Sequence, residues 1–240
     1  MRTAPLAALI ALSLALSAGP ALSQQNVDKV FGGITAESGQ EYGSLESVNG
    51  GITVREGATV RAAETVNGGI SIADRARVGS AETVNGGINV GDAAKVGTLE
   101  TVNGGISLNQ GAMVERDVET VNGGIRGHRG VEIGGNAETV NGGLTFEGAK
   151  VGGRLATTNG DITLDATHVR GGILVEKPSM GWWNSGTSRK PRIVIGPGSV
   201  VEGTLLFERE VELFVHASAK VGTVTGATAQ AYTDKLPPRD

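Results

Sequence analysis

The sequence predicts an all-β chain that winds into a single-stranded parallel β-helix, with roughly 18 residues and three short strands in each coil. Three observations support this fold class: one seven-residue run recurs along much of the chain, 39 of the 240 residues are Gly, and only eight residues are aromatic. So few large side chains favour a thin solenoid, which buries small and β-branched residues, over a broad globular core.

The repeated run is Glu-Thr-Val-Asn-Gly-Gly-Ile, with small changes between copies. It occupies residues 46–52, 64–70, 82–88, 100–106, 119–125 and 138–144, and degenerate copies occupy residues 28–34 and 156–162. The period is therefore roughly 18 residues, and the two steps that begin at Glu100 and Glu119 are longer by one residue. This interval is too short for a helix pair or a propeller blade, but it fits one coil of a β-helix.

Each coil has its own turn and strand signals. Asn-Gly-Gly tolerates positive φ and predicts a corner, and the following alternation, as in Ile70 and Ile72, predicts a strand with two inward side chains. A second corner is expected around Gly57, Gly91 or Gly111, followed by an Ala-x-Val strand. The third strand runs through Glu-Thr-Val. A helix is disfavoured because each Gly in it would cost roughly 1 kcal/mol.

The third strand could face the interior with either of its two alternating sets of side chains. Stacked coils place equivalent Glu residues about 4.8 Å apart, and each adjacent pair would repel by about 0.9 kcal/mol in water and by several times more inside a protein. The Glu and Val rows are therefore expected outside, and the Thr row inside. The inward residues beside the Thr row are Ala63, Ala81, Leu99, Val118 and Leu155.

The outward rows form the candidate interaction surface. It consists of a Val row (Val48, Val66, Val84, Val102, Val121 and Val140), a Glu row (Glu64, Glu82, Glu100 and Glu119, extended by Glu46 and Glu138), and the pair Trp182 and Trp183. The Val row either marks the lateral association of two β-helices or is covered by the aliphatic parts of neighbouring Arg and Glu side chains. The Glu row collects divalent cations or a basic partner, or is a solvated acidic face.

The corner Asn residues are expected to point inward and to form an amide ladder from coil to coil. They are Asn49, Asn67, Asn85, Asn103, Asn122, Asn141 and Asn159.

The handedness of the coil has two candidate answers. Aliphatic residues six apart, from Val78 through Val84, Val90, Val96 and Val102, imitate the hexapeptide repeat of left-handed β-helices. However, every third strand then carries Glu where a small inward residue belongs, and the two longer steps break the six-residue phase. We therefore favour a right-handed coil, about 50 Å long for ten or eleven coils.

The domain boundaries follow from where the motif fades. The β-helix is expected over 24–229, with regular coils at 28–173, irregular coils at 192–226 and a flexible tail at 230–240. Residues 176–191, rich in Gly, Pro and Ser, read as a loop insert. Its Trp182 and Trp183 either stack on a sugar or partner, or form a lid over the last coils.

The segment 1–23 has the pattern of a secretory signal peptide. Arg2 precedes an apolar run over 6–18, and small residues follow at Ala21 and Ser23. The apolar run is shorter than the ~20 residues that span a bilayer as a helix, which disfavours the alternative of an uncleaved anchor. The mature chain is then expected without a transmembrane segment, in the periplasm, at the cell surface or in the medium.

The composition excludes several kinds of chemistry. The net charge of −4 argues against a nucleic-acid partner, and the absence of Cys excludes disulfides, thiolate zinc sites and thiol nucleophiles. The three histidines, His128, His168 and His216, lack metal-ligand spacing, and no nucleophile elbow or phosphate loop is present. We therefore expect no enzyme activity and no cofactor. The alternative is a carbohydrate-binding or carbohydrate-cleaving β-helix enzyme, whose carboxylates would lie outside the Glu row.

Two stretches resemble known families. Residues 157–164, Thr-Thr-Asn-Gly-Asp-Ile-Thr-Leu, with Gly171-Gly172-Ile173, resemble the repeats of the DUF4097 putative-adhesin family. Residues 148–155 and 196–203 are similar to the bactofilin, or polymer-forming, repeat. Both resemblances imply a β-helix without catalytic residues. The expected function is a self-associating or adhesin-like envelope scaffold, with a second copy of the chain, the cell envelope or a polysaccharide as partner.

Overall fold

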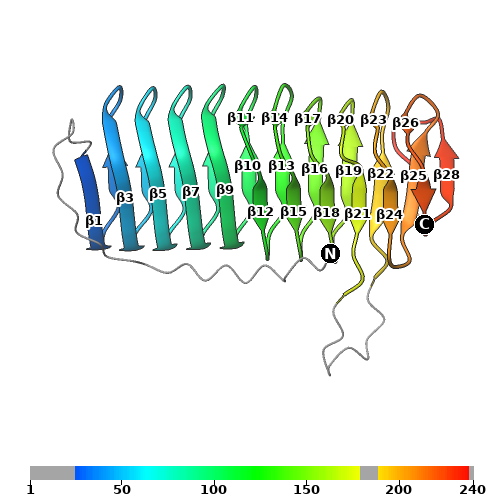
Figure 1. The fold of residues 1–240 in the computed structure, drawn as a ribbon, viewed down its shortest axis with the longest axis horizontal. Coiled ribbons are helices and arrows are strands. Elements are labelled where there is room, and N and C mark those ends of the chain that lie inside the picture. Colours follow the sequence, from blue (N-terminus) through cyan, green and yellow to red (C-terminus); the bar gives the residue numbers. More distant parts are fainter. Residues whose placement is uncertain (1–24, 179–188, 238–240) are drawn as a thin grey trace.

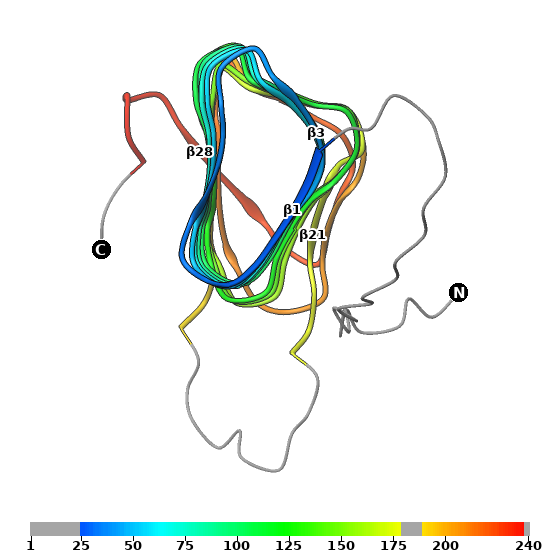
Figure 2. The same cartoon turned by 90° about the vertical axis from the view of Figure 1, so that its left-hand side faces the viewer.

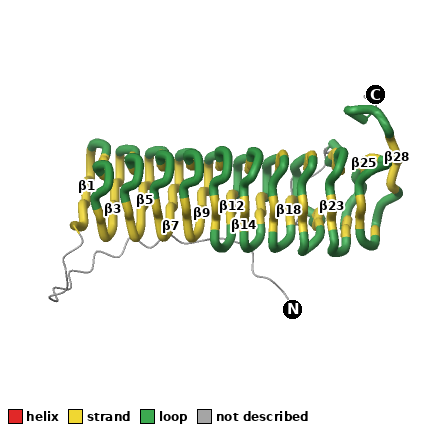
Figure 3. The backbone as a smooth tube through the Cα atoms, turned by 90° about the horizontal axis from the view of Figure 1, so that it is seen from above, coloured by secondary structure: helices red, strands yellow, loops and turns green. Residues whose placement is uncertain are grey.

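The computed structural model describes residues 25–178 and 189–237, and in these ranges the chain forms a straight rod of stacked coils without a helix (Figure 1). Paired strands lie parallel, and each residue of a regular coil pairs with its counterpart in the next repeat, as Ile70 does with Ile88 and Ile106 with Ile125. The predicted parallel β-helix, with one sequence repeat in each coil, is confirmed. Seen from above, the coils follow one another evenly along the rod (Figure 3).

One side of the rod is an eleven-stranded sheet to which each coil contributes one short strand. Its members are β2 (Ile34–Ala36), β4 (Ile52–Val54), β6 (Ile70–Ile72), β8 (Ile88–Val90), β10 (Ile106–Leu108), β13 (Ile125–Gly127), β16 (Leu144–Glu147), β19 (Ile162–Asp165), β22 (Arg192–Ile195), β25 (Glu212–His216) and β28 (Ala229–Tyr232).

The other sides belong to a seventeen-stranded sheet. It begins with five long strands, β1 (Gln25–Phe31), β3 (Glu41–Asn49), β5 (Thr59–Asn67), β7 (Arg77–Asn85) and β9 (Lys95–Asn103). Six pairs of shorter strands continue it: β11 (Met113–Val114) with β12 (Val118–Thr120), β14 (Glu132–Ile133) with β15 (Ala137–Thr139), β17 (Lys150–Val151) with β18 (Leu155–Thr157), β20 (His168–Val169) with β21 (Ile173–Val175), β23 (Val200–Val201) with β24 (Leu205–Phe207), and β26 (Lys220–Val221) with β27 (Val224–Thr225). The three short strands predicted for each coil therefore hold from β10 onward, whereas two of them are fused in the first coils.

One inserted residue separates the two forms of coil. Val114 pairs with Val96, but Val118 pairs with Leu99, so the later coil has one residue more between these positions than the earlier coil. The extra residue therefore lies between Val114 and Val118, where the long strand gives way to two short ones. In Figure 2 this corner stands farther out in the later coils than in the first ones.

The coil is right-handed. In Figure 1 the long strands run downward on the near side of the rod, and the chain advances toward the C-terminal end with each turn. Viewed from the N-terminal end, the chain runs clockwise as it recedes (Figure 2). This agrees with the handedness favoured by the two longer steps of the repeat.

The interior is one continuous apolar core that follows the rod from Ile34 to Leu213. The alternation predicted for each strand is observed: Ile70 and Ile72 are buried, and so are Ala58 and Val60 of the coil corner. On the third side, the residues predicted to face inward beside the Thr row are completely buried. They are Ala63, Ala81, Leu99, Val118 and Leu155.

The glycines of the Asn-Gly-Gly corner are needed for a different reason from the one predicted. Gly50 through Gly143 of the regular corners do not have positive φ; among the glycines of this corner only Gly32, in the degenerate first copy, does. Instead, a Cβ atom on Gly104 would overlap the carbonyl oxygen of Gly86 in the preceding coil, and the same holds for the first glycine of each regular corner. Close approach of stacked backbones, rather than left-handed backbone, excludes a side chain there.

The second corner does use left-handed backbone. Gly57 and Gly111 have φ of 68° and 69°. In the two coils between them, Arg75 (φ 57°) and Ala93 (φ 53°) occupy the equivalent position. The corner predicted around Gly91 is present, but its left-handed residue is Ala93, two positions later, in a region that ordinarily favours Gly.

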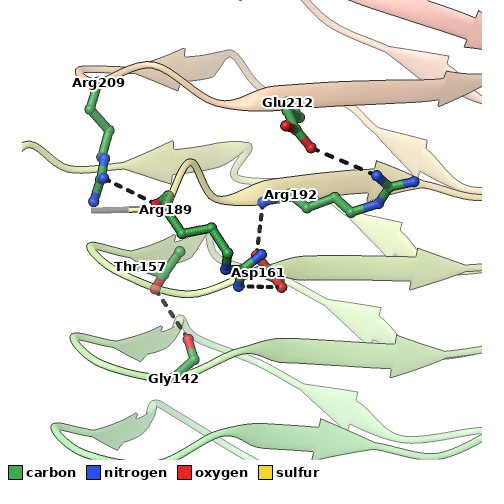
Figure 4. A network of polar contacts seen from close by, with 7 residues as sticks. All are labelled: Gly142, Thr157, Asp161, Arg189, Arg192, Arg209 and Glu212. Carbon is green, nitrogen blue, oxygen red and sulfur yellow. Dashed lines mark hydrogen bonds and ion pairs between the residues drawn. The ribbon is translucent and has the colours of Figure 1, made fainter. Parts of the chain in front are cut away.

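The insert interrupts the rod where the composition predicted it. β21 ends at Val175 and β22 begins at Arg192, and Ile162 pairs with Ile193 across the insert. The returning end is held by Asp161, which replaces the second glycine of the corner motif. Its Oδ1 accepts a hydrogen bond from the Arg192 N–H at 2.8 Å, and its Oδ2 accepts one from the Arg189 guanidinium at 2.8 Å (Figure 4).

The rod extends past the boundary predicted at residue 229. Strand β28 pairs with β25 up to Tyr232, which is buried and lies edge-on to the His216 ring at 5.0 Å between centroids. The predicted tail therefore begins later than residue 230, because an apolar ring closes the last coil.

Candidate interaction surface

The repeated Glu residues form one file along the rod. Strand pairing places Glu46 beside Glu64, and each later pairing adds the next member, through Glu82, Glu100 and Glu119 to Glu138. All six side chains are partly exposed. The structure thus brings together the Glu residues that the sequence predicted to stack on the outside.

The buried Thr row fixes which way this strand faces. Thr65, Thr83 and Thr101 are almost completely buried. Each hydroxyl donates a hydrogen bond to a glycine carbonyl of the preceding coil, as Thr83 does to Gly68 at 2.8 Å. Because neighbours alternate across a strand, the inward Thr places the flanking Glu and Val on the outer surface.

The Val row is less exposed than predicted. Val48, Val66, Val84, Val102 and Val121 are half-buried. Only Val140, at 37 %, counts as an exposed large hydrophobic residue. The row nevertheless presents a continuous apolar line along six consecutive coils, because its neighbours on either side pair in register from coil to coil.

Stacking and partial burial perturb the Glu row. Desolvation, followed by repulsion from Glu100 and Glu138, raises the pKa of Glu119 to about 7. The pKa of Glu82 is raised by desolvation and by its neighbours Glu100 and Glu64. Desolvation also raises the pKa of Glu64, with Glu46 adding to the shift and Arg61 opposing it. Part of this file therefore holds protons at pH values where an isolated Glu is ionised.

The predicted Asn ladder is present, but it lies outside the core. The Nδ2 of each corner Asn donates to the Oδ1 of the previous one at 2.9 Å, from Asn67 to Asn159. All seven side chains are exposed, so the prediction that they point inward is wrong. At the corner the strand alternation ends, and the Thr hydroxyls, not the amides, satisfy the inner carbonyls.

Both ends of the ladder are closed. Asn49 donates to the Val30 carbonyl at 3.5 Å, and Asn159 accepts a hydrogen bond from the Arg209 guanidinium at 2.8 Å. Arg209 also donates to the Thr158 carbonyl, and near it the insert rejoins the rod (Figure 4).

The remaining candidate features are a metal site on the Glu row, the histidines and the tryptophans. Among the described residues, which include the whole Glu row, no group of three or more His, Asp or Glu side chains is arranged to hold a metal ion. His168 pairs with Glu202 at 2.7 Å, and His216 contacts Ser218 at 2.8 Å. Trp182 and Trp183 lie outside the described residues.

Two shallow grooves were not predicted from the sequence. They lie over the first half of the long strands and over the short strands that continue them in the later coils. The larger, of about 560 Å³, is bordered by Arg61, Arg77, Lys95 and Arg116, and we call it the basic groove. The second, of about 320 Å³, begins at Met113 and continues over the next coils. Of the four basic residues of the basic groove, only Arg77 and Lys95 stand at equivalent positions of successive repeats, so the repeat pattern gives little signal for the groove.

Comparisons with family models, curated proteins and solved structures yield no match for this chain. Within the described ranges no helix is long and apolar enough to cross a membrane.

Proposed function

We propose that this chain is an exported, non-catalytic scaffold of adhesin-like type that associates with a second copy of itself through the Val row. The observation that carries the proposal is the half-exposed apolar line of six Val side chains in register beside the Glu row. The signal-peptide pattern of residues 1–23 and the resemblance to putative-adhesin and polymer-forming repeats support it.

The Glu row determines how two such rods would pack. In an antiparallel twofold pair, Val would face Val, but the two Glu rows would also face each other and repel. In a parallel twofold pair, the rows of Val still meet. The two Glu rows then lie on opposite sides of the Val contact, so each Glu row faces the partner's Asn row. A parallel arrangement is therefore favoured. One line of small side chains buries little area, so the association is expected to be weak and concentration-dependent.

Sedimentation over a range of concentrations tests this proposal. We expect the parent chain to form a larger species as its concentration rises, and Val84→Lys with Val102→Lys to abolish that species, since two charges would be placed in the apolar line. The matched control, Ser71→Lys with Asn89→Lys, adds the same charges to the outward side of β6 and β8 and should leave association intact. A parent chain that stays monomeric, or a control that fails in the same way, would refute the proposal.

A further inference from the structure

The basic groove concentrates positive charge on a chain that is acidic overall. Arg61, Arg77, Lys95 and Arg116 come from four successive coils and are all exposed, and Glu115 is the single acidic residue among the lining residues. The groove therefore carries a local charge of +3 on a protein of net charge −4. In the described part of the chain, none of the four cations takes part in an ion pair.

Glycines keep the floor of the groove open. Gly79 and Gly97 lie between the basic side chains, and a Cβ on either would overlap the backbone of the preceding coil. A Cβ on Gly97 would also lie 3.3 Å from the Arg116 guanidinium, which therefore reaches over the floor. Arg116 stands at the corner with the inserted residue, so the first widened coil supplies the end wall of the groove.

In the second groove, on the same face of the rod, two basic side chains have acidic partners. There Lys150 pairs with Glu132 at 2.7 Å, and His168 pairs with Glu202 at 2.7 Å. The cations of the basic groove have no such partners in their own strand file, since Arg77 and Lys95 stack on each other and on Thr59. Like charges in adjacent strands are unfavourable unless a bound anion compensates them.

The shape and charge of the basic groove indicate its ligand. Its cations come one from each of four successive coils, which lie about 4.7–4.9 Å apart along the rod, and Arg77 and Lys95 pair in register; this spread suits an extended chain with repeated negative groups better than a compact anion. The lining residues include no aromatic side chain. That disfavours single-stranded nucleic acid, whose bases stack on aromatic rings, and neutral sugars bound by stacking.

We propose that the basic groove binds a linear acidic polysaccharide, with the Arg guanidinium groups donating paired hydrogen bonds to its carboxylates. The site lies on the first half of the long strands, apart from the Val row, and does not depend on self-association.

Titration calorimetry of the purified chain with polygalacturonate oligomers tests this inference, with the methyl-esterified oligomers as the uncharged probe. We expect the acidic probe to bind, its affinity to fall with added salt, and the esterified probe not to bind. Arg77→Gln with Lys95→Gln should weaken binding at least about tenfold, because two charge-assisted contacts are lost. Sedimentation of this variant should match that of the parent, which separates loss of the groove from loss of association.

The control removes the same two charges elsewhere. Arg126→Gln with Lys220→Gln changes one Arg and one Lys, both exposed, on β13 and β26 away from the groove. This control should bind like the parent. Equal weakening in both double variants, equal binding of the esterified probe, absence of binding by the acidic probe, or tighter binding of oligothymidylate would each overturn the inference.

Discussion

A single carbonyl oxygen explains two residues of the repeat. The Gly86 oxygen accepts a hydrogen bond from the Thr101 hydroxyl at 2.9 Å, and Gly104 of the same later coil lies directly against it. The oxygen is thereby enclosed by one donor and one Cα hydrogen. Thr and Gly recur together because a buried carbonyl needs a partner and because the stacked corners leave no room for a Cβ.

Replacing that glycine should therefore be costly. Gly104→Ala is expected to lower the free energy of unfolding by about 2–4 kcal/mol, through overlap with the Gly86 backbone and weakening of the Thr101 hydrogen bond. The midpoint of urea unfolding measures the effect. Gly105→Ala is the matched control, because its Cβ would stand 3.2 Å from the nearest oxygen, that of Gly124. Equal destabilisation by the two variants would contradict this account.

At the scale of the element, the Asn ladder joins separate coils along one edge. Its six amide–amide hydrogen bonds run from Asn49 to Asn159, with Val30 and Arg209 closing the ends. Hydrogen bonds in such a chain polarise one another, so an interior member contributes more than an end.

Removing an interior member tests the ladder. Asn103→Ala breaks the hydrogen bonds to Asn85 and from Asn122, and should destabilise the chain by roughly 1–2 kcal/mol, near the low end for two hydrogen bonds because the amides are exposed. Asn89→Ala, an exposed Asn on β8 of the preceding coil, is the control and should change stability little. The measurement is the midpoint temperature of thermal unfolding of the two variants. Equal midpoints for Asn103→Ala and Asn89→Ala would mean that the ladder adds nothing to stability.

Several of these elements were predictable from the sequence because the length and pattern of the repeat correspond directly to the length and strands of one coil. The period of the repeat gives the coil, and the alternation of Ile70 and Ile72 gives the inward strand positions. Repulsion within a Glu column gives the outward face. The Asn side chains could not be placed because alternation fails where a strand turns a corner. The basic groove could not be foreseen because it depends on residues brought together from four coils, none of which forms a motif alone.

At the scale of the whole molecule, stacking turns each repeated ionisable residue into a column whose members repel one another. Desolvation by partial burial raises the pKa values of Glu64, Glu82 and Glu119 most, and repulsion within the column adds to each shift. A Glu whose pKa is higher in the folded than in the unfolded chain makes folding more favourable at low pH. That contribution is complete below the ordinary value of 4.5 and is lost as the pH rises through about 7 for Glu119.

The column should therefore make the rod less stable at pH 8 than at pH 5. Glu119→Gln is neutral at both pH values, so at pH 8 it should be more stable than the parent by on the order of 1 kcal/mol after solvent screening, with a smaller difference at pH 5. Urea unfolding at the two pH values measures this. Glu41→Gln, on the exposed first residue of β3 and beside Thr59 rather than another Glu, should not reduce the pH dependence. If Glu119→Gln leaves the loss of stability between pH 5 and 8 as large as in the parent, the column does not act on folding through repulsion and desolvation at this site.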